Sequence, residues 1–396
     1  MSKLDELINE LCPNGVEYIP LERCCNILDN LRKPVTKSVR QEGQYPYYGA
    51  NGIQDFVSDY IFDGIFVLVG EDGSVLTKNG TPVVTWAEGK IWVNNHAHII
   101  SEREGILLRY LFHYLQTVNI TSLIHGNIPK LTGKDFKAIQ IARPPLPVQE
   151  EIVRILDNFT ELTAELTAEL TARKKQYEYY RDNLLLQSNN TANIPLKEIV
   201  KKSCSGGTPT KGNNLYYDNG NIPWLRTQDV KFNEIYEIDS FITEEAVAKT
   251  SAKWIPANCV IVAISGATAG RCAINKIPTT TNQHCLNLEI DPLKALYKYV
   301  FYCLCSRYEE LISKKQGARG DLNSSLVLGF DIPIPYPNDI DKSLDEQQRI
   351  VDILDRFDTL CNDISNGLPA EIKARQQQYE YYRDKLLTFS KAELEV

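Results

Sequence analysis

With 396 residues, of which 43% are hydrophobic and 24% charged, the chain can form two or three folded domains and is not typical of a disordered protein. It has no run of about 18 apolar residues, and its acidic start, MSKLDELINELCPNG, lacks the blocks of a signal peptide; we therefore expect a cytoplasmic protein without a membrane span. The net charge of −8 does not exclude nucleic acid as a partner, because the acidic residues are concentrated in two segments. Segments 148–193 and 344–396 carry −3 and −4, whereas segments 17–147 and 194–343 carry 0 and +1.

The chain contains a tandem duplication. The heptapeptide QYEYYRD occurs at 176–182 and again at 378–384. Weaker matches precede it in the same order: Ile152-Val153 with Ile350-Val351, Asn95 with Asn282, and Ile19-Pro20-Leu21 with Ile194-Pro195-Leu196. An ordered series whose offset grows slowly indicates duplication followed by small insertions.

Each half begins with a globular α/β (α+β) domain and continues into a long helix. The globular parts contain short β-rich runs such as IFVLVGEDG and CVIVAISGATAG, then a helical pattern and a proline-rich exit. We predict domains at 1–147 and 189–343, and long helices at 148–188 and 344–396.

The two long helices have apolar residues at alternating steps of three and four, which is the pattern of a coiled coil. We expect them to pair as an antiparallel coiled coil; the alternative is that each packs only on its own domain. Gly367-Leu368-Pro369 predicts a kink in the second helix. The repeated tetrapeptide TAEL at 163–170 predicts a spacer that sets the length of the first helix.

Motifs for catalysis or for metal binding are weak. The ten cysteines form no CxxC pair and are interpreted as buried thiols. No Walker-type GxxxxGK[ST] motif is present, and the strand-like RCAINKI after Ser265–Gly270 favours a tight hairpin over a phosphate loop or a methyl-donor loop. Glu371-x-Lys373 resembles a nuclease motif but lies in a predicted helix. For His96 and His98, which share a strand face, a metal site, a polar contact to DNA and a structural role remain open.

Polar, basic and aromatic residues gather in loops at matching places of both halves, where Arg can read guanine and Asn or Gln can read adenine. In the first half the candidate DNA contacts are Arg32, Lys33, Tyr47, Tyr48, Asn51, Lys78, Asn94, Asn95, His96 and Lys130. In the second half they are Thr208, Thr210, Lys211, Arg226, Gln228, Thr268, Arg271, Asn282, Gln283 and Arg319. Two such sets on a duplicated scaffold indicate two sites that recognise DNA.

The whole pattern resembles the specificity subunit of Type I restriction–modification systems. The resemblance is carried by YPYYGANGI, DYIFDG and WVNNHAH in the first half, and by GGTP, IPWLRTQD, GATAG and the GxxxxLN block at 317–323 in the second. The helix openings PPLPVQEEIVRILD and LDEQQRIVDILD and the paired QYEYYRD ends complete it.

This resemblance implies a non-catalytic subunit with two target-recognition domains, each of which reads one half of a bipartite double-stranded DNA target. It also implies an antiparallel coiled coil that sets domain spacing and docks two methyltransferase subunits. Those subunits would methylate adenine with S-adenosylmethionine, so no cofactor is expected on this chain. Restriction subunits that cleave DNA are further partners that the resemblance allows.

Two other classes stay open: a DNA methyltransferase or nuclease with an unrecognised site, and a coiled-coil adaptor that never touches DNA. Methyl transfer or cleavage by the purified chain would favour the first. A purified complex without sequence preference would favour the second.

Overall fold

The computed structural model describes residues 2–73, 76–125, 129–186, 190–315, 321–363 and 366–392. The chain divides into two compact units: Met1–Thr167 with Glu371–Val396, and Ala168–Ala370. Each unit is a mixed α/β structure with its own buried core, in agreement with the predicted fold class. Arg319 and most of the GxxxxLN block lie outside the described residues.

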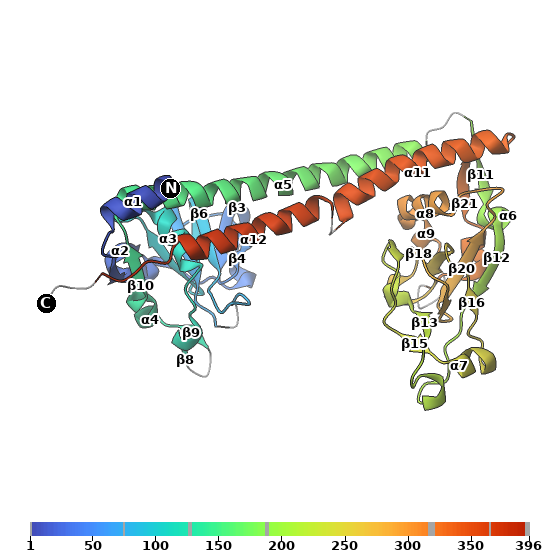
Figure 1. Cartoon of the computed structure of the whole chain (residues 1–396), viewed down its shortest axis with the longest axis horizontal. Coiled ribbons are helices and arrows are strands. Elements are labelled where there is room, and N and C mark those ends of the chain that lie inside the picture. The colour runs from blue at the N-terminus through green and yellow to red at the C-terminus, as the bar shows by residue number, and fades with distance from the viewer. Residues whose placement is uncertain are drawn as a thin grey trace. The chain divides into compact units, whose positions relative to one another are not determined.

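The first unit is built on a six-stranded sheet with the order β2-β7-β5-β6-β3-β4 (Figure 1). Its central strand β5 (Phe62–Gly70) carries the apolar run FVLVG, all of which is buried. The other strands are β1 Glu17–Pro20, β2 Asn26–Ile27, β3 Glu42–Gly49, β4 Gly52–Val57, β6 Val84–Val93, β7 Ala97–Ser101, β8 Ile124–His125, β9 Lys130–Leu131 and β10 Gln140–Arg143. The helices are α1 Lys3–Leu11, α2 Leu21–Cys24, α3 Leu108–Leu115, α4 Gly133–Ala138 and parts of α5 and α12.

The second unit has a five-stranded sheet, β12-β20-β17-β18-β14, and a four-stranded sheet, β15-β13-β19-β16. Strands of this unit are β11 Thr191–Pro195, β12 Val200–Ser205, β13 Ile222–Leu225, β14 Asn233–Ile235, β15 Phe241–Ile242, β16 Trp254–Ile255, β17 Val260–Ala263, β18 Cys272–Asn275, β19 Thr279–Thr281, β20 Cys285–Ile290 and β21 Asp331–Pro335. Its helices are α6 Leu196–Ile199, α7 Glu244–Lys249, α8 Tyr297–Ser306, α9 Tyr308–Ser313, α10 Ser324–Leu328, α11 Ile340–Asn362 and part of α5. Strands β17 and β18 pair antiparallel, so the GATAG segment forms the predicted hairpin.

Local capping determines where several helices begin. The side-chain oxygen of Thr132 accepts a hydrogen bond from the backbone of Asp135, and Thr243 and Asn323 do the same for α7 and α10. Such caps satisfy backbone N–H groups that have no partner within the helix.

The duplication is visible in repeated hydrogen bonds, which supports the inference drawn from QYEYYRD. The side-chain oxygen of Gln149 accepts from the backbone of Leu107 at 2.9 Å, and Gln347 accepts from Leu296 at the same distance. Both glutamines are fully buried, so each fixes the start of the central helix of its unit, α3 or α8, against the long helix of that repeat.

The first long helix, α5, runs without interruption from Leu146 to Leu186, against predicted bounds of 148 and 188. The second predicted helix is two helices, α11 and α12 (Leu368–Leu386), and the expectation of one kinked helix over 344–396 is corrected (Figure 1). Only glycine fits at position 367, because a Cβ there would lie 2.5 Å from the carbonyl oxygen of Thr359. Pro369 is tolerated near the start of α12, where its missing N–H has no partner to lose.

Apolar seam residues of the long helices meet within each unit. In the first unit Phe159 stacks on Tyr382, with ring centroids 5.4 Å apart. In the second unit Tyr180 stacks on Phe357 at 5.8 Å. Because α12 packs in the first unit, where Leu387 also joins the core, the alternative that each helix packs only on its own domain is excluded for α12.

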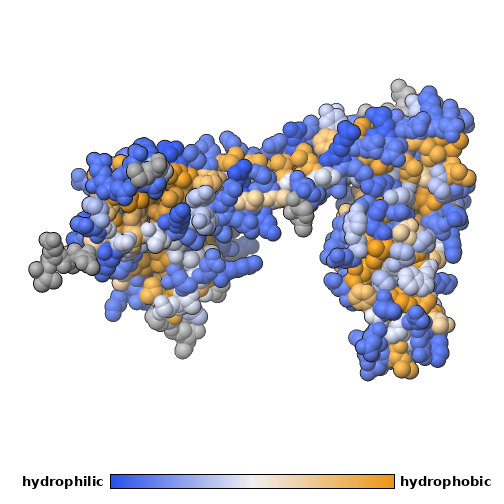
Figure 2. Space-filling view, viewed as in Figure 1, coloured by the Kyte–Doolittle hydropathy of each residue, from blue (hydrophilic) through white to orange (hydrophobic). Residues whose placement is uncertain are grey.

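Residues 389–392 also pack in the first unit. The backbone of Val16 donates to the carbonyl of Ser390 at 2.9 Å, and the hydroxyl of Tyr18 donates to that of Phe389. Within the described residues, none of the helices combines the length and the apolar composition needed to cross a membrane. The face of each unit seen in Figure 2 is mostly hydrophilic, with apolar patches along the helices.

The cysteines are unpaired, as the absence of CxxC motifs predicts. Eight of them are buried, while Cys204 and Cys305 are half-buried. Burial raises the pKa of the Cys285 and Cys259 thiols to about 12, which keeps them protonated and unreactive.

Candidate nucleic-acid interface

The loops between strands β6 and β7 and between β19 and β20 are equivalent. Gly70 pairs with Ala97 in the first unit, and Ala263 pairs with Cys285 in the second. One residue farther along, the backbone of Glu71 donates to the carbonyl of His96, and the backbone of Ile264 donates to that of His284, both at 2.9 Å. His96 and His284 therefore occupy the same place in the two units.

An asparagine shapes each loop. The side-chain oxygen of Asn94 accepts from the backbone of His96 at 2.8 Å, and that of Asn282 accepts from His284 at 3.1 Å. The residue equivalent to Asn282 is thus Asn94, and its assignment to Asn95 from sequence was wrong by one position. Both asparagines are buried, with exposed fractions of 3% and 9%, so the expected base contacts give way to a structural role.

Each histidine ring is held by a residue from the loop of a neighbouring strand. Asp72 is the second residue after β5, and Ser265 is the second residue after β17. The Nδ1 of His96 lies 2.9 Å from a carboxylate oxygen of Asp72, and the Nδ1 of His284 lies 2.6 Å from the hydroxyl of Ser265. A fixed Nδ1 orients each ring, and Nε2 is the second ring nitrogen, which in His284 contacts the amide of Gln283. Of these residues the sequence prediction chose only His96 as a DNA contact; the offset of 188 between His96 and His284, which falls within the offsets of the repeat, is the signal that pairs the two histidines.

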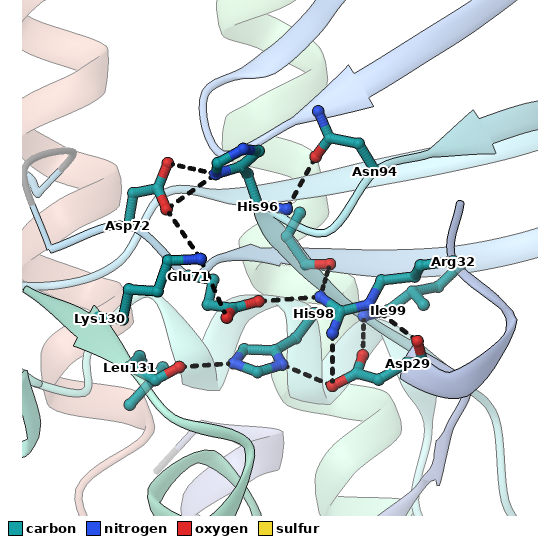
Figure 3. A network of polar contacts seen from close by, with 11 residues as sticks. Asp29, Arg32, Glu71, Asp72, Asn94, His96, His98, Ile99, Lys130 and Leu131 are labelled. Atoms are coloured by element: carbon teal, nitrogen blue, oxygen red, sulfur yellow. Dashed lines mark hydrogen bonds and ion pairs between the residues drawn. The ribbon is translucent and has the colours of Figure 1, made fainter. Parts of the chain in front are cut away.

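Two predicted DNA contacts of the first unit, Arg32 and Lys130, take part in an internal polar network (Figure 3). The guanidinium of Arg32 donates to Glu71 at 2.9 Å and to the carbonyl of Ala97 at 2.7 Å. Lys130 lies 3.5 Å from Glu71 and 3.8 Å from Asp72. With its side chain only 14% exposed, Arg32 pairs with the half-buried carboxylates of Glu71 and Asp29, so its expected DNA contact is corrected to a structural role.

His98 belongs to the same network and not to a metal site (Figure 3). Its Nδ1 lies 2.6 Å from Asp29, its Nε2 lies 3.0 Å from the carbonyl of Leu131, and its ring stacks on Phe136. Burial works against the ionised carboxyl of Asp29, but hydrogen bonds from His98 and from the backbone of Ile99 hold its pKa below the usual value. Among the residues that the structure describes, no three His, Cys, Asp or Glu side chains are grouped to hold a metal ion.

Tyr47 and Tyr48 are core residues, which corrects another expectation. Tyr47 is 1% exposed, and its hydroxyl bonds to both backbone groups of Val35. Arg40 packs 4.0 Å above the ring centroid of Tyr47. Neither tyrosine offers a surface to DNA. Lys33, Asn51, Lys78 and Asn95 are exposed, and their contacts to DNA stay a prediction.

In the second unit the predicted loops converge on His284. The hydroxyl of Thr208 donates to the side-chain oxygen of Gln283, whose nitrogen lies 3.1 Å from Nε2 of His284. With the contact between Ser265 and His284, this series joins three loops that are far apart in the sequence. Thr208 and Gln283 are exposed.

The double glycine of the GGTP motif serves this convergence. The backbone of Gly207 donates to the carbonyl of Thr281 at 2.8 Å, and a Cβ on Gly206 would lie 2.0 Å from the same oxygen. The glycines therefore allow close approach to the neighbouring strand, which brings Thr208 to Gln283.

Arg226 carries a buried Nε that has no hydrogen-bond partner among the described residues. Its guanidinium carbon lies 5.9 Å from the ring centroid of Trp224, which itself donates to the carbonyl of Gly207. Asn282 donates its backbone N–H to Leu225, so Arg226 comes directly after a residue bonded to the histidine loop. Arg226 therefore keeps one donor available for an acceptor.

The remaining candidates differ in exposure. Thr210, Lys211 and Gln228 are exposed, whereas Thr268 and Arg271 are half-buried. No contact between any of these residues and DNA is tested by the geometry, and their role stays a prediction.

Comparison with known proteins gives a consistent result. The family model described as "Type I restriction modification DNA specificity domain" matches residues 13–173 and 189–374. A putative type I restriction enzyme specificity subunit of Haemophilus influenzae is 36% identical over 95% of this chain and 96% of its own length. The EcoR124I/EcoR124II specificity subunit of Escherichia coli is 39% identical over 72% of each chain.

Solved structures show the same fold at low sequence identity. The S subunit of a Type I restriction-modification system from M. genitalium gives a TM-score of 0.58 with 14% identity, covering 95% of this chain and 97% of that one. The HsdS subunit from Thermoanaerobacter tengcongensis gives a TM-score of 0.50 with 16% identity, covering 95% and 97%.

Proposed function

The chain belongs to the Type I restriction modification DNA specificity family, as a non-catalytic specificity subunit with two target-recognition domains, and we propose that it directs a methyltransferase complex to a bipartite DNA sequence. Each domain, placed by us at 1–147 and 189–343, reads one half of the target. The observation that carries this proposal is the repeated histidine loop, which presents His96 in one unit and His284 in the other.

The two loops fit groove contacts because each ring is fixed before DNA arrives. Nδ1 is held by Asp72 or by Ser265, so little conformational freedom is lost when Nε2 meets a base edge. Gln283 and Thr208, whose side chains are of the kinds that can bond to bases, are linked to His284, and Arg226 follows Leu225, which bonds to the same loop. The loops differ between the units, which suits an asymmetric target.

The long helices suit a spacer and a docking platform for two methyltransferase subunits. In the second unit Cys361 lies within the electrostatic reach of Lys174, and Phe357 contacts Tyr180. Residue numbers thus increase along α5 while those of the facing residues decrease along α11. This opposite direction supports an antiparallel coiled coil.

The complex that we propose methylates adenine, with S-adenosylmethionine bound by the methyltransferase subunits and no cofactor on this chain. Restriction subunits would add cleavage. We place the complex in the cytoplasm, where DNA and S-adenosylmethionine are available.

Methylation mapping of DNA treated with the complex tests the proposal. The wild-type complex should methylate one bipartite motif, and His284→Ala should relax one half of it while His96→Ala relaxes the other. Each loss should amount to roughly 1–3 kcal/mol of discrimination. The two variants are matched controls, since each should leave untouched the half that the other domain reads.

Methylation without sequence preference by the wild-type complex would refute the proposal. Methyl transfer by the isolated chain would show instead that it is an enzyme.

A further inference from the structure

Each unit contains a hollow at the same place of the repeat. In the first unit a hollow of about 630 Å³ lies where α3 meets α5, and in the second a hollow of about 760 Å³ lies where α8 meets α11. The wall of the first contains Arg109 paired with Asp157, and that of the second contains Lys298 paired with Asp355. Both ion pairs measure 2.8 Å, so the two hollows share one structural plan.

A second hydrogen bond to each carboxylate fixes this plan. Nε2 of His113 lies 2.8 Å from Asp157, and the hydroxyl of Tyr302 donates to Asp355 at 2.6 Å. A different side chain thus makes the same contact in the two copies, which indicates that the position of the carboxylate matters at both places.

Both hollows have the same excess of negative charge. The first has three carboxylates against one cation: Glu88, Glu102 and Asp157 against Arg109. The second has four against two: Glu234, Asp355, Asp358 and Asp363 against Lys231 and Lys298. Such walls repel DNA phosphates and attract a basic side chain.

Aromatic and apolar side chains complete each wall. Trp86 and the 53% exposed Ile65 line the first hollow. Tyr236, which is 61% exposed, and Phe232 line the second. Arginine stacks on aromatic faces and pairs with carboxylates, and Arg109 already lies 4.7 Å from the ring centroid of Trp86.

Asp358 is an exposed acidic group of the second hollow, close to Asp355 and Glu234. Partial shielding from water raises its pKa above the ordinary value, and the charges of Asp355 and Glu234 add to this, although the amide of Asn362 donates to it at 2.9 Å. Lys298 is occupied by Asp355 and by Glu234, from which it lies 2.8 and 3.2 Å away. An added positive group near Asp358 would relieve the repulsion among these carboxylates.

We propose that each hollow receives an arginine from one copy of the same partner polypeptide, the methyltransferase subunit of the complex. Two copies bind one chain because the duplication supplies two equivalent hollows. This inference rests on the proposed function and adds to it the place and the chemistry of docking.

Binding of purified methyltransferase subunit to the full-length chain, followed by analytical ultracentrifugation, tests the inference. The wild-type chain should bind two copies. Asp358→Lys should weaken one copy about tenfold or more and leave the other unchanged, while Glu102→Lys should weaken the other copy. The chain that carries both Asp358→Lys and Glu102→Lys should bind neither copy of the methyltransferase subunit. Added salt should weaken the binding of both copies to the wild-type chain.

Matched controls reverse exposed acidic residues outside the hollows: Glu309→Lys in the second unit and Glu10→Lys in the first should keep both copies. Asp358→Asn and Glu102→Gln remove the charge without reversing it, and should give smaller losses in the same order even if a reversal disturbs folding. Two copies bound with unchanged affinity by all four hollow variants would overturn the docking inference alone. A wild-type chain that binds no methyltransferase subunit would overturn the proposed function and this inference together.

Discussion

The TAEL tract of α5 offers a direct test of how the spacing between half-sites is set. In the structure the tract lies in one uninterrupted helix of 41 residues, which corresponds to roughly 60 Å. The hydroxyl of Thr163 donates to the carbonyl of Phe159, and that of Thr167 donates to the carbonyl of Thr163. Deleting Thr167–Leu170 would therefore place Thr171 where Thr167 stood, and the helix would continue in nearly the same register.

This deletion shortens the helix by about 6 Å and rotates the part of the chain beyond it by about 400°, roughly 40° beyond a full turn. DNA advances about 3.4 Å and turns roughly 34–36° per base pair. The rotation matches one base pair while the translation is nearer two. We expect rotation to dominate, because a misrotated domain faces away from its groove, whereas bending or sliding absorbs a few ångströms.

The expected result is an unchanged pair of half-sites with a spacer shorter by about one base pair. Methylome sequencing of cells that carry the deletion variant with its methyltransferase subunit measures it. An unchanged spacer, or different bases in either half-site, would refute the idea that the tract acts as a ruler.

Three further predictions concern single residues. Arg226→Ala should relax specificity in one half-site at a cost of roughly 1–3 kcal/mol. Lys211→Ala should instead weaken binding to all sequences alike and lower the salt dependence of binding. A binding titration in which both variants have equal effects would contradict this difference. Burial lowers the pKa of His113 below its usual 6.5 despite the hydrogen bond to Asp157, so its stabilising effect is complete above about pH 6.5 and is lost as the pH falls toward the folded-state pKa. His113→Tyr, which copies Tyr302 of the second unit, should melt with a weaker dependence on pH between about 7.5 and 5.5 than wild type, and equal slopes in a thermal scan would count against it. Gly206→Ala should destabilise the second unit by about 1–3 kcal/mol because its Cβ meets Thr281, while Gly133→Ala, with nothing within 4 Å, should not; denaturant unfolding of the two variants decides this.

The sequence alone determined the duplication, the long helices and the class of function, because these rest on local features. Helical periodicity, the identical QYEYYRD segments and the proline-rich exits act over a few residues and need no tertiary contacts to be read. The interruption near Gly367 was also foreseen, but not that it separates two helices or that only glycine fits beside Thr359.

Tertiary structure decided which loop residues face outward. Tyr47, Arg32 and Asn94 have the side chains of DNA contacts, yet the first is buried, the second pairs with Glu71, and the third bonds to the backbone of His96. Contacts between residues far apart in the chain decide whether a polar side chain faces solvent or bonds to a buried partner. These contacts leave no periodic pattern in the sequence.

The same reason explains why His284 was not chosen as a contact and why Asn282 was matched to the wrong asparagine. Its equivalence to Asn94 lies in the hydrogen bonds to His284 and to Leu225, because the sequence offers two adjacent asparagines, Asn94 and Asn95, and only the bonded geometry distinguishes them. Sequence determined that there are two copies of one scaffold, whereas only the folded loops decided which residues correspond within it.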